Sequence, residues 1–423
     1  MGAVLHLQSP QPTWENNHIM RIVRTTSRPS FRRYRRRSGC LSFVIVLGVV
    51  LGVGLISSNR IIRWFDASHE GAARENNEEI RRQAARAFGS GDLERAVELG
   101  RAALASNPLD VGMLGVVVRA LIYQSYSEID RAIDRDSALE LVSSAIRGDP
   151  LNRDIGAVYA FALAAAGNPV EASEVADRIL DADPENALAR IAQGLAHGGV
   201  GSYSIARRES ELAVQSAHTY AGGTFQIDAL RALAIAQSDL GDYTGAIATV
   251  EQAIGLNGQI VSFYFERALY ALQIGDADAA TVAYYQVLAL QPENVKARLR
   301  LCELSSLLRE SEQAIMYCTQ VVERAAAYAE GWYRLGREYF LIGSFEQARD
   351  TLHRCSSLQV MQDVPISERR FECWYLQGQA AEILGDCDSL VATYREYQAM
   401  AAESELNGVW IYPPEGPPMC SGR

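Results

Sequence analysis

The chain has 423 residues, of which 48% are hydrophobic, and a formal net charge of −11. The first 37 residues contain eight arginines and one acidic residue, so the remaining chain holds 32 basic and 50 acidic residues. Because so acidic a chain repels phosphate, we exclude nucleic acid as a partner. The acidic part instead favours basic partners or serves solubility.

The N-terminal part predicts a membrane anchor. Residues 1–37 read as a basic, disordered cytosolic segment, and residues 38–59 contain no charge. A helix of that length spans about 33 Å, enough to cross a bilayer. The arginines before it place the N-terminus in the cytosol by the positive-inside rule, so we expect everything after residue 59 to lie outside. Residues 60–76 are predicted to be a linker or a continuing helix.

Two alternatives to a simple anchor stay open. One is a cleaved signal peptide, although the apolar run is long and no small-x-small cleavage site follows it. A second concerns Gly48 and Gly52, which form G-x-x-x-G and predict a homodimer through the membrane helix. Glycine is also common in such helices without pairing them.

A repeat occupies residues 77–402. A glycine followed by a small polar residue opens the series at Gly91 and recurs from Gly167 on at spacings of 34, 40, 34 and 68, with an alanine five positions after each glycine. Self-similarity in this range is typical of stacked helix pairs. The glycines are Gly91, Gly167, Gly201, Gly241, Gly275 and Gly343, and the alanines are Ala96, Ala172, Ala206, Ala246, Ala280 and Ala348.

The best-formed copy begins at Trp332 and resembles the tetratricopeptide repeat family. The matching positions are Trp332, Leu335, Gly336, Tyr339, Gly343, Phe345 and Ala348, and prolines close other copies at Pro108, Pro150, Pro184 and Pro292. The resemblance implies an all-α, right-handed superhelical solenoid of antiparallel helix pairs, about nine copies long and preceded by one transmembrane helix. Small residues on each first helix are expected to face the second helix: Ala160, Gly194, Ala234, Ala268, Gly336 and Gly378.

Four places depart from the pattern. The sequence predicts a longer turn near Ser125–Arg135, an insertion near Tyr220–Thr224 and another at Met361–Arg370. One copy has Arg309-Glu310 where the turn glycine belongs. After the last copy, residues 403–423 form a proline-rich tail that either packs back or stays free.

Six cysteines after the predicted membrane helix agree with an oxidising compartment. They allow fifteen pairings, and six buried thiols are an alternative. The repeat register favours Cys302 with Cys318 and places Cys355 and Cys373 on successive helices, which leaves Cys387 with Cys420.

No catalytic or metal-binding motif is present: the sequence contains no H-E-x-x-H, G-x-S-x-G, Walker lysine or C-x-x-C. The glycine-rich run His197–Ser202 lies on a repeat turn and lacks a lysine. We predict that the chain is not an enzyme and uses no cofactor and no metal.

Arrays of this kind bind partners along the face formed by the first helices. In the register of Trp332, that face is expected to carry arginines and aromatics, which interfaces favour and which helix packing does not require. The paired asparagines and lysines with which family members grip C-terminal carboxylates are absent. The predicted partner-binding residues are Arg231, Phe265, Arg300, Tyr333, Arg337, Phe340 and Tyr375.

The sequence therefore predicts a single-pass, membrane-anchored interaction scaffold or assembly factor outside the cytosol, with a protein partner. The architecture resembles bacterial anchored repeat proteins that assist translocation or envelope assembly. The alternative is a chaperone-like accessory that holds client polypeptides.

Overall fold

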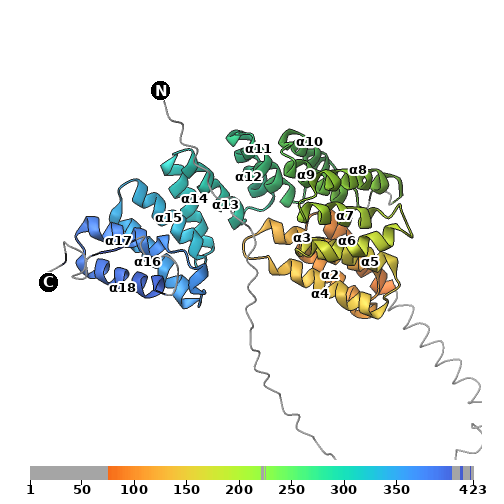
Figure 1. Ribbon diagram of the computed structural model, residues 1–423, viewed down its shortest axis with the longest axis horizontal. Coiled ribbons are helices and arrows are strands. Elements are labelled where there is room, and N and C mark those ends of the chain that lie inside the picture. The colour runs from red at the N-terminus through yellow and green to blue at the C-terminus, as the bar shows by residue number, and fades with distance from the viewer. Residues whose placement is uncertain (1–74, 221–222, 224, 403–409, 413–419, 421–423) are drawn as a thin grey trace, which may run out of the picture. The chain divides into compact units, whose positions relative to one another are not determined.

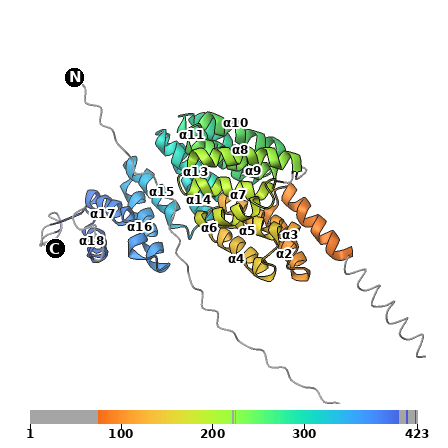
Figure 2. The ribbon, with the colours of Figure 1, turned by 45° about the vertical axis from the view of Figure 1, so that its right-hand side comes forward.

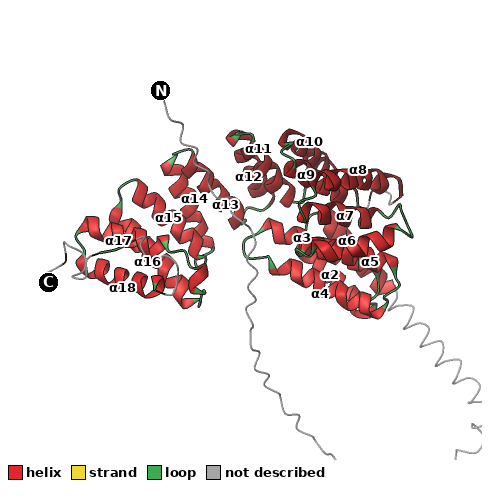
Figure 3. Ribbon diagram, in the orientation of Figure 1, coloured by secondary structure: helices red, strands yellow, loops and turns green. Residues whose placement is uncertain are grey.

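The computed structural model describes residues 75–220, 223, 225–402, 410–412 and 420. The predicted cytosolic segment, membrane helix and most of the linker lie outside these residues. Within the described part, no helix combines the length and apolar character that crossing a bilayer requires. The described residues form helices and loops, and no strand occurs among them (Figure 3).

The helices form consecutive pairs, which we number as copies one to nine (Figure 1). Copies one to three pair residues 75–89 with α2 (Leu93–Ser106), α3 (Val111–Ser127) with α4 (Ile133–Gly148), and α5 (Arg153–Ala165) with α6 (Pro169–Leu180). Copies four to six pair α7 (Ala187–Gly199) with α8 (Tyr203–Tyr220), α9 (Gln226–Asp239) with α10 (Tyr243–Leu256), and α11 (Ser262–Gln273) with α12 (Ala277–Leu290). Copies seven to nine pair α13 (Val295–Leu307) with α14 (Ser311–Arg324), α15 (Ala329–Leu341) with α16 (Phe345–Met361), and α17 (Glu372–Leu384) with α18 (Cys387–Ala401).

First and second helices form two layers. Each helix packs against the next one in the chain, and first helices of neighbouring copies also contact one another, as α5 does with α7 and α15 with α17. Figure 2 shows the pairs α15–α16 and α17–α18 following one another. We call the layer of first helices the inner layer. It is the face on which the sequence placed the binding residues.

The glycine–polar dipeptide works as a two-part turn. Gly241 adopts a φ of +79°, which ends the first helix in a left-handed residue, and Asp242 then caps the second helix by accepting from the backbone N–H of Gly245 at 3.0 Å. In copy seven, Arg309 takes the same left-handed conformation at φ +63°. The turn is therefore kept where its glycine is missing, at a cost in backbone strain.

The small residues allow close packing between the paired helices. A Cβ on Gly194 would lie 2.4 Å from the Ser210 Oγ, and one on Gly336 would lie 2.6 Å from the Leu352 Cγ. The alanines five positions after the turn glycines are fully buried: Ala96, Ala172, Ala206, Ala246, Ala280 and Ala348. These contacts fix the spacing of the pairs.

One expectation about local structure needs correction, and one gains a new feature. The extra length near Ser125–Arg135 is only partly a turn, because α3 continues to Ser127 and residues 128–132 make the connection. Gly378 also makes room for the tail, because a Cβ there would lie 2.0 Å from the Trp410 Cη2.

The described part of the tail covers the last helix pair. Trp410 is 6% exposed, and its ring meets Tyr394 and Tyr397 edge-on at centroid distances of 5.0 and 5.2 Å. The Cys387–Cys420 disulfide ties the tail to the start of α18. A stacked array leaves its final pair with one apolar side uncovered, and Trp410 supplies that cover.

We predict that Gly336→Ala lowers the free energy of unfolding by about 2 kcal/mol, because the buried Leu352 cannot move aside. The matched control is Gly255→Ala, at an exposed helical glycine with nothing within 4 Å of the new Cβ. That change should stabilise the chain by about 0.5–1 kcal/mol. Urea unfolding of the two variants checks this, and equal effects would contradict the packing argument.

We also expect Trp410→Ala to loosen the end of the array locally. Truncating a buried tryptophan costs about 3–5 kcal/mol, so amide hydrogen exchange in α17 and α18 should accelerate while α5 to α8 stay protected. Ile411→Ala is the control, since that neighbouring side chain is 71% exposed. Uniform acceleration along the chain would show that the tail is not a local cap.

Candidate functional site

The inner layer of the earlier copies is filled by contacts between distant copies. Tyr123 of α3 donates a hydrogen bond to Asp228 of α9 at 2.7 Å, and Arg119 forms an ion pair with the same carboxylate. The side chains of Arg119 and Asp228 are 5% and 0% exposed. The ring of Tyr123 also meets Phe263 of α11 edge-on at 5.4 Å.

Arg231 belongs to the same buried region. Its guanidinium forms an ion pair with Glu266 at 2.6 Å and lies over the ring of Tyr126, 4.4 Å from the centroid. Burial raises the pKa of Glu266, and the pairing with Arg231 opposes that shift. Arg231 is 6% exposed, so the structure removes it from the accessible surface where the sequence placed it.

Copy seven is joined to the end of α3. Asn294 caps α13 through its Oδ1 and donates from its Nδ2 to the Ser127 carbonyl at 2.9 Å and to Glu128 at 2.7 Å. Lys296 donates to the Tyr126 carbonyl, and its ammonium lies 4.8 Å from the centre of the Phe265 ring.

The prediction that Phe265 is accessible is also wrong, because this residue is 8% exposed and covered by Lys296. We call Arg119, Tyr123, Asp228, Arg231, Glu266 and Lys296 the closure cluster. Positive and negative side chains alternate within the cluster. Charged groups packed in this way stabilise the fold only while each keeps a partner of opposite sign. These side chains are packed among the described helices and are not displayed to a partner.

The later copies present a different inner face. Glu303 of α13 pairs with Arg300 at 2.6 Å and with Arg334 of α15 at 3.1 Å. Glu330 pairs with Arg334 at 2.7 Å and with Arg370, before α17, at 2.5 Å. We call these five residues the charge ladder, and their side chains are between 19% and 37% exposed.

The ladder contains residues that the sequence reasoning missed. Glu303, Glu330, Arg334 and Arg370 were not predicted, although acids three or four positions from an arginine on one helix are a recognisable signal. The predicted Arg300 is part of the ladder. The ladder's side chains are partly exposed, so a partner can reach them from solvent.

Four predicted residues lie on or near this face in different settings. Tyr333 is 8% exposed and lies under Arg370 at 4.6 Å, so it belongs to the core and its removal would lower stability, contrary to expectation. Arg337 is 38% exposed and donates to the Ser306 Oγ at 3.1 Å. Phe340 packs edge-on against Phe345 at 5.4 Å.

Tyr375 is engaged by the tail, because its ring meets Trp410 edge-on at 5.8 Å. Within the predicted set, Arg300, Arg337, Phe340 and Tyr375 thus stay partly exposed, and Arg231, Phe265 and Tyr333 are buried. A role for the partly exposed residues in binding a partner stays a prediction.

Three disulfides link the same part of the array. Cys302–Cys318 joins α13 to α14, Cys355–Cys373 joins α16 to α17, and Cys387–Cys420 holds the tail. The Cα–Cα distances are 5.2, 6.0 and 5.5 Å. These are the pairs that the repeat register favoured.

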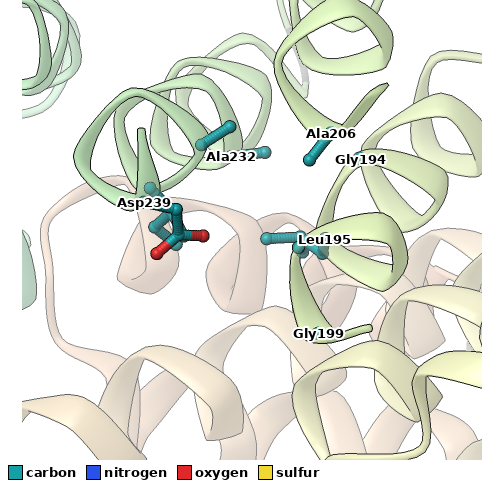
Figure 4. Close-up of a pocket in the computed structure, with 9 residues that line it drawn as sticks. Gly194, Leu195, Gly199, Ala206, Ala232 and Asp239 are labelled. Atoms are coloured by element: carbon teal, nitrogen blue, oxygen red, sulfur yellow. The ribbon is translucent and has the colours of Figure 1, made fainter. Parts of the chain in front are cut away.

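A pocket lies between the copies four and five. Figure 4 shows Asp239 of α9 and Leu195 of α7 facing one another across it, with Gly199 and Ala206 on the copy-four side. Its volume is about 240 Å³. The lining is apolar except for the carboxylate of Asp239, whose pKa is raised by burial. Among the residues that the structure describes, no cluster of three or more acidic, histidine or cysteine side chains suits a metal ion.

Comparison with known proteins identifies the repeats. Residues 132–196 and 231–297 match family models described as tetratricopeptide repeat. Together with the helix pairs, these matches make the fold a tetratricopeptide-like, all-helical solenoid. Proteins built from such repeats generally mediate protein–protein interaction, so protein partners are indicated. No curated protein matches the chain.

Similar solved structures share low sequence identity with this chain. The Cut9–Hcn1 hetero-tetramer of the APC/C is 17% identical over 74% of this chain, with a TM-score of 0.47, and this chain spans 57% of its length. A tetratricopeptide repeat protein from Parabacteroides merdae is 18% identical over 62% of this chain and 99% of its own, with a TM-score of 0.37. The C-terminal part of a repeat protein from Cytophaga hutchinsonii is 14% identical over 60% and 99%, with a TM-score of 0.49.

Lys296 offers a direct test of the closure cluster, because it is the single lysine of the chain. Burial and the nearby Arg300 lower its pKa to about 8, while Glu128 and Glu266 oppose the shift. We expect one ¹³C-lysine resonance that titrates near pH 8 in the native chain and near its ordinary value of 10.5 in urea. A native midpoint near the ordinary value would contradict burial of the ammonium.

The sign of the stability effect follows from that shift. Between about pH 8 and 10.5 the unfolded chain binds more protons at Lys296 than the native chain, so stability rises with pH. The gain between pH 7.5 and 9.5 should be roughly 2 kcal/mol. Lys296→Met removes the titrating group, and its urea midpoint should lack this increment.

Proposed function

We propose that the chain is a membrane-anchored scaffold or assembly factor outside the cytosol that binds a protein partner through the inner face of copies seven to nine. The uncharged stretch at residues 38–59 and the arginines before it support the anchor and its orientation. The three disulfides favour an oxidising compartment. A homodimer through Gly48 and Gly52 is part of the same proposal.

The observation that carries the binding face is the contrast within the inner layer. In the earlier copies this layer is occupied by the closure cluster, and in the later copies it presents the partly exposed charge ladder. Where two arginines pair with the same carboxylate, one of them can instead form an ion pair with a carboxylate of the partner. Planar guanidinium groups also bind partner carboxylates through two bonds at once.

The ladder therefore suits a partner segment that carries both signs of charge. Incoming acids would pair with Arg334 and Arg370, and incoming bases with Glu303 and Glu330. Complementary charges of this kind fix the register of a partner and speed its association.

A chaperone-like activity is the second candidate, favoured by a different observation. Apolar side chains stand exposed at the turns of the same copies: Leu307 is 77% exposed, Leu341 59% and Ile383 55%. Exposed aliphatic residues of this size are suited to holding unfolded clients.

The test is capture of partners from intact membranes followed by mass spectrometry. We predict that Arg334→Gln combined with Arg370→Gln weakens capture at least about tenfold, because it removes two charge-assisted contacts. The matched control is Arg95→Gln with Arg207→Gln, two arginines that pair with acids on second helices. Circular dichroism and hydrogen exchange check that both variants keep the fold.

The outcomes separate the candidates. One stable partner set that is lost only in the ladder variant supports the scaffold. Many unfolded clients, captured equally by both variants, support the chaperone. Equal capture of a stable partner by both variants would place the interface elsewhere. Cleavage of the array by protease added to the cytosolic side would overturn the orientation.

A further inference from the structure

We propose that the pocket between copies four and five binds a basic side chain, lysine or arginine, of a protein partner. This adds a second contact region to the array, and it rests on the function proposed above only in that a partner supplies the side chain. Three features carry it: the shape of the pocket, the state of its carboxylate and the position of that carboxylate in the repeat.

The pocket exists because copy four has no side chain at Gly198, near the end of α7. A Cβ on Gly198 would lie 3.4 Å from the Asp239 Oδ2 and 4.0 Å from the Ala206 Cβ, whereas a Cβ on Gly199 would meet Pro169 instead. In the other copies with a left-handed turn residue, the position of Gly198 carries a side chain: Phe88, Ser127, Ala164, Ser238, Leu272, Ser306, Phe340 and Glu382. The space is thus particular to copy four.

Its size and lining fit one alkyl side chain. A volume of about 240 Å³ is below the usual range of drug-sized sites, roughly 300–1,000 Å³. The walls are aliphatic, formed by Leu195, Ala232, Ile235 and Ala236. The methylene stem of a lysine or arginine is buried readily along such a wall while its charged head stays near water.

The only charge in the lining is the carboxylate of Asp239. It makes no hydrogen bond and no ion pair with any residue of the described ranges, and the residue is exposed at the pocket. The apolar wall beside it raises the pKa of the Asp239 carboxyl, and an incoming ammonium or guanidinium can pair with the carboxylate there. An anion would be repelled, and a purely apolar group would leave the carboxylate unpaired.

The repeat does not require a carboxylate at this position. Asp239 stands two residues before the left-handed turn residue, and the equivalent residues in the other copies are Gly89, Glu128, Ala165, Gly199, Gln273, Leu307, Leu341 and Ile383. The acids there are Asp239 and Glu128, and Glu128 already accepts a hydrogen bond from Asn294. Next to the pocket, Val200 and Leu240 are exposed and provide apolar contact for residues that flank the basic side chain.

The test uses the full chain in detergent, with methyl-labelled alanine, leucine and isoleucine, and n-butylammonium as the probe. We expect saturable shifts of the Leu195, Ala232 and Ile235 methyl signals at millimolar probe, the range open to a ligand of about five heavy atoms. Two matched probes dissect the contact: n-butanol keeps the stem without the charge, and methylammonium keeps the charge without the stem. Each should bind at least about tenfold more weakly.

Two variants locate the effect. Asp239→Asn keeps the shape and should weaken n-butylammonium about tenfold. Gly198→Leu fills the pocket, at a helical position where a Cβ fits, and should abolish the shifts. Asp278→Asn, an exposed acid in the first turn of α12, is the control and should bind like the unaltered chain.

Equal binding of n-butanol and n-butylammonium, or unchanged binding by Asp239→Asn, would overturn the proposal. Shifts spread over the acidic surface would overturn it as well. The probe needs no partner, so these outcomes stand apart from the scaffold proposal. That proposal fails instead if the unaltered chain captures no protein from membranes.

Discussion

The array depends on the burial of each helix pair against the next. One pair has an apolar face on both sides and cannot cover either alone, so neighbours supply the second wall. Within each pair, residues with small or no side chains bring the two helices close together, such as Gly336 against Leu352 and the fully buried Ala348. Among the described residues α17 and α18 are the last pair, and Trp410 packs on them. Its large flat ring lies over Gly378 and covers apolar surface there, as a following helix pair does elsewhere in the array.

A second constraint acts between copies far apart in sequence. Asp228 pairs with Arg119 and Tyr123 across more than a hundred residues, and Asn294 binds the end of α3 while capping its own helix. Buried charges of this kind add little net stability but penalise any arrangement that separates them. The closure cluster therefore holds the earlier copies in one arrangement and fills their inner layer. Lys296 sits at its edge, where a compact ammonium reaches a backbone carbonyl and still meets the face of Phe265.

The inner layer therefore has two parts with different roles. The part that contains the closure cluster is packed and structural, and the part around Glu303 and Glu330 carries charges that are paired yet partly exposed. All three disulfides lie in this second part or in the tail beyond it. A disulfide stabilises a fold mainly by restricting the conformations of the unfolded chain. This matters most in copies eight and nine, whose described residues make no contact with distant copies like those of the closure cluster.

The sequence by itself determined the periodic features: the helix pairs, the turns and the small residues at close contacts. It favoured one pairing of the cysteines, which the structure confirms. The periodic features follow from spacing along one chain, because helix period and turn chemistry are local. Tertiary structure alone decided which inner-layer residues are accessible. Arg231 and Phe265 look like surface positions in the repeat register, but Arg231 is covered by Tyr126 of the distant helix α3 and Phe265 by Lys296 of the next copy. The sequence also gave no sign of a role for Asp239, because an acid near a helix end is ordinary and only the folded chain shows the pocket that the missing side chain of Gly198 leaves beside it. The local sequence pattern determines which helix and which face a residue belongs to. Contacts with other segments of the folded chain determine whether a partner can reach it.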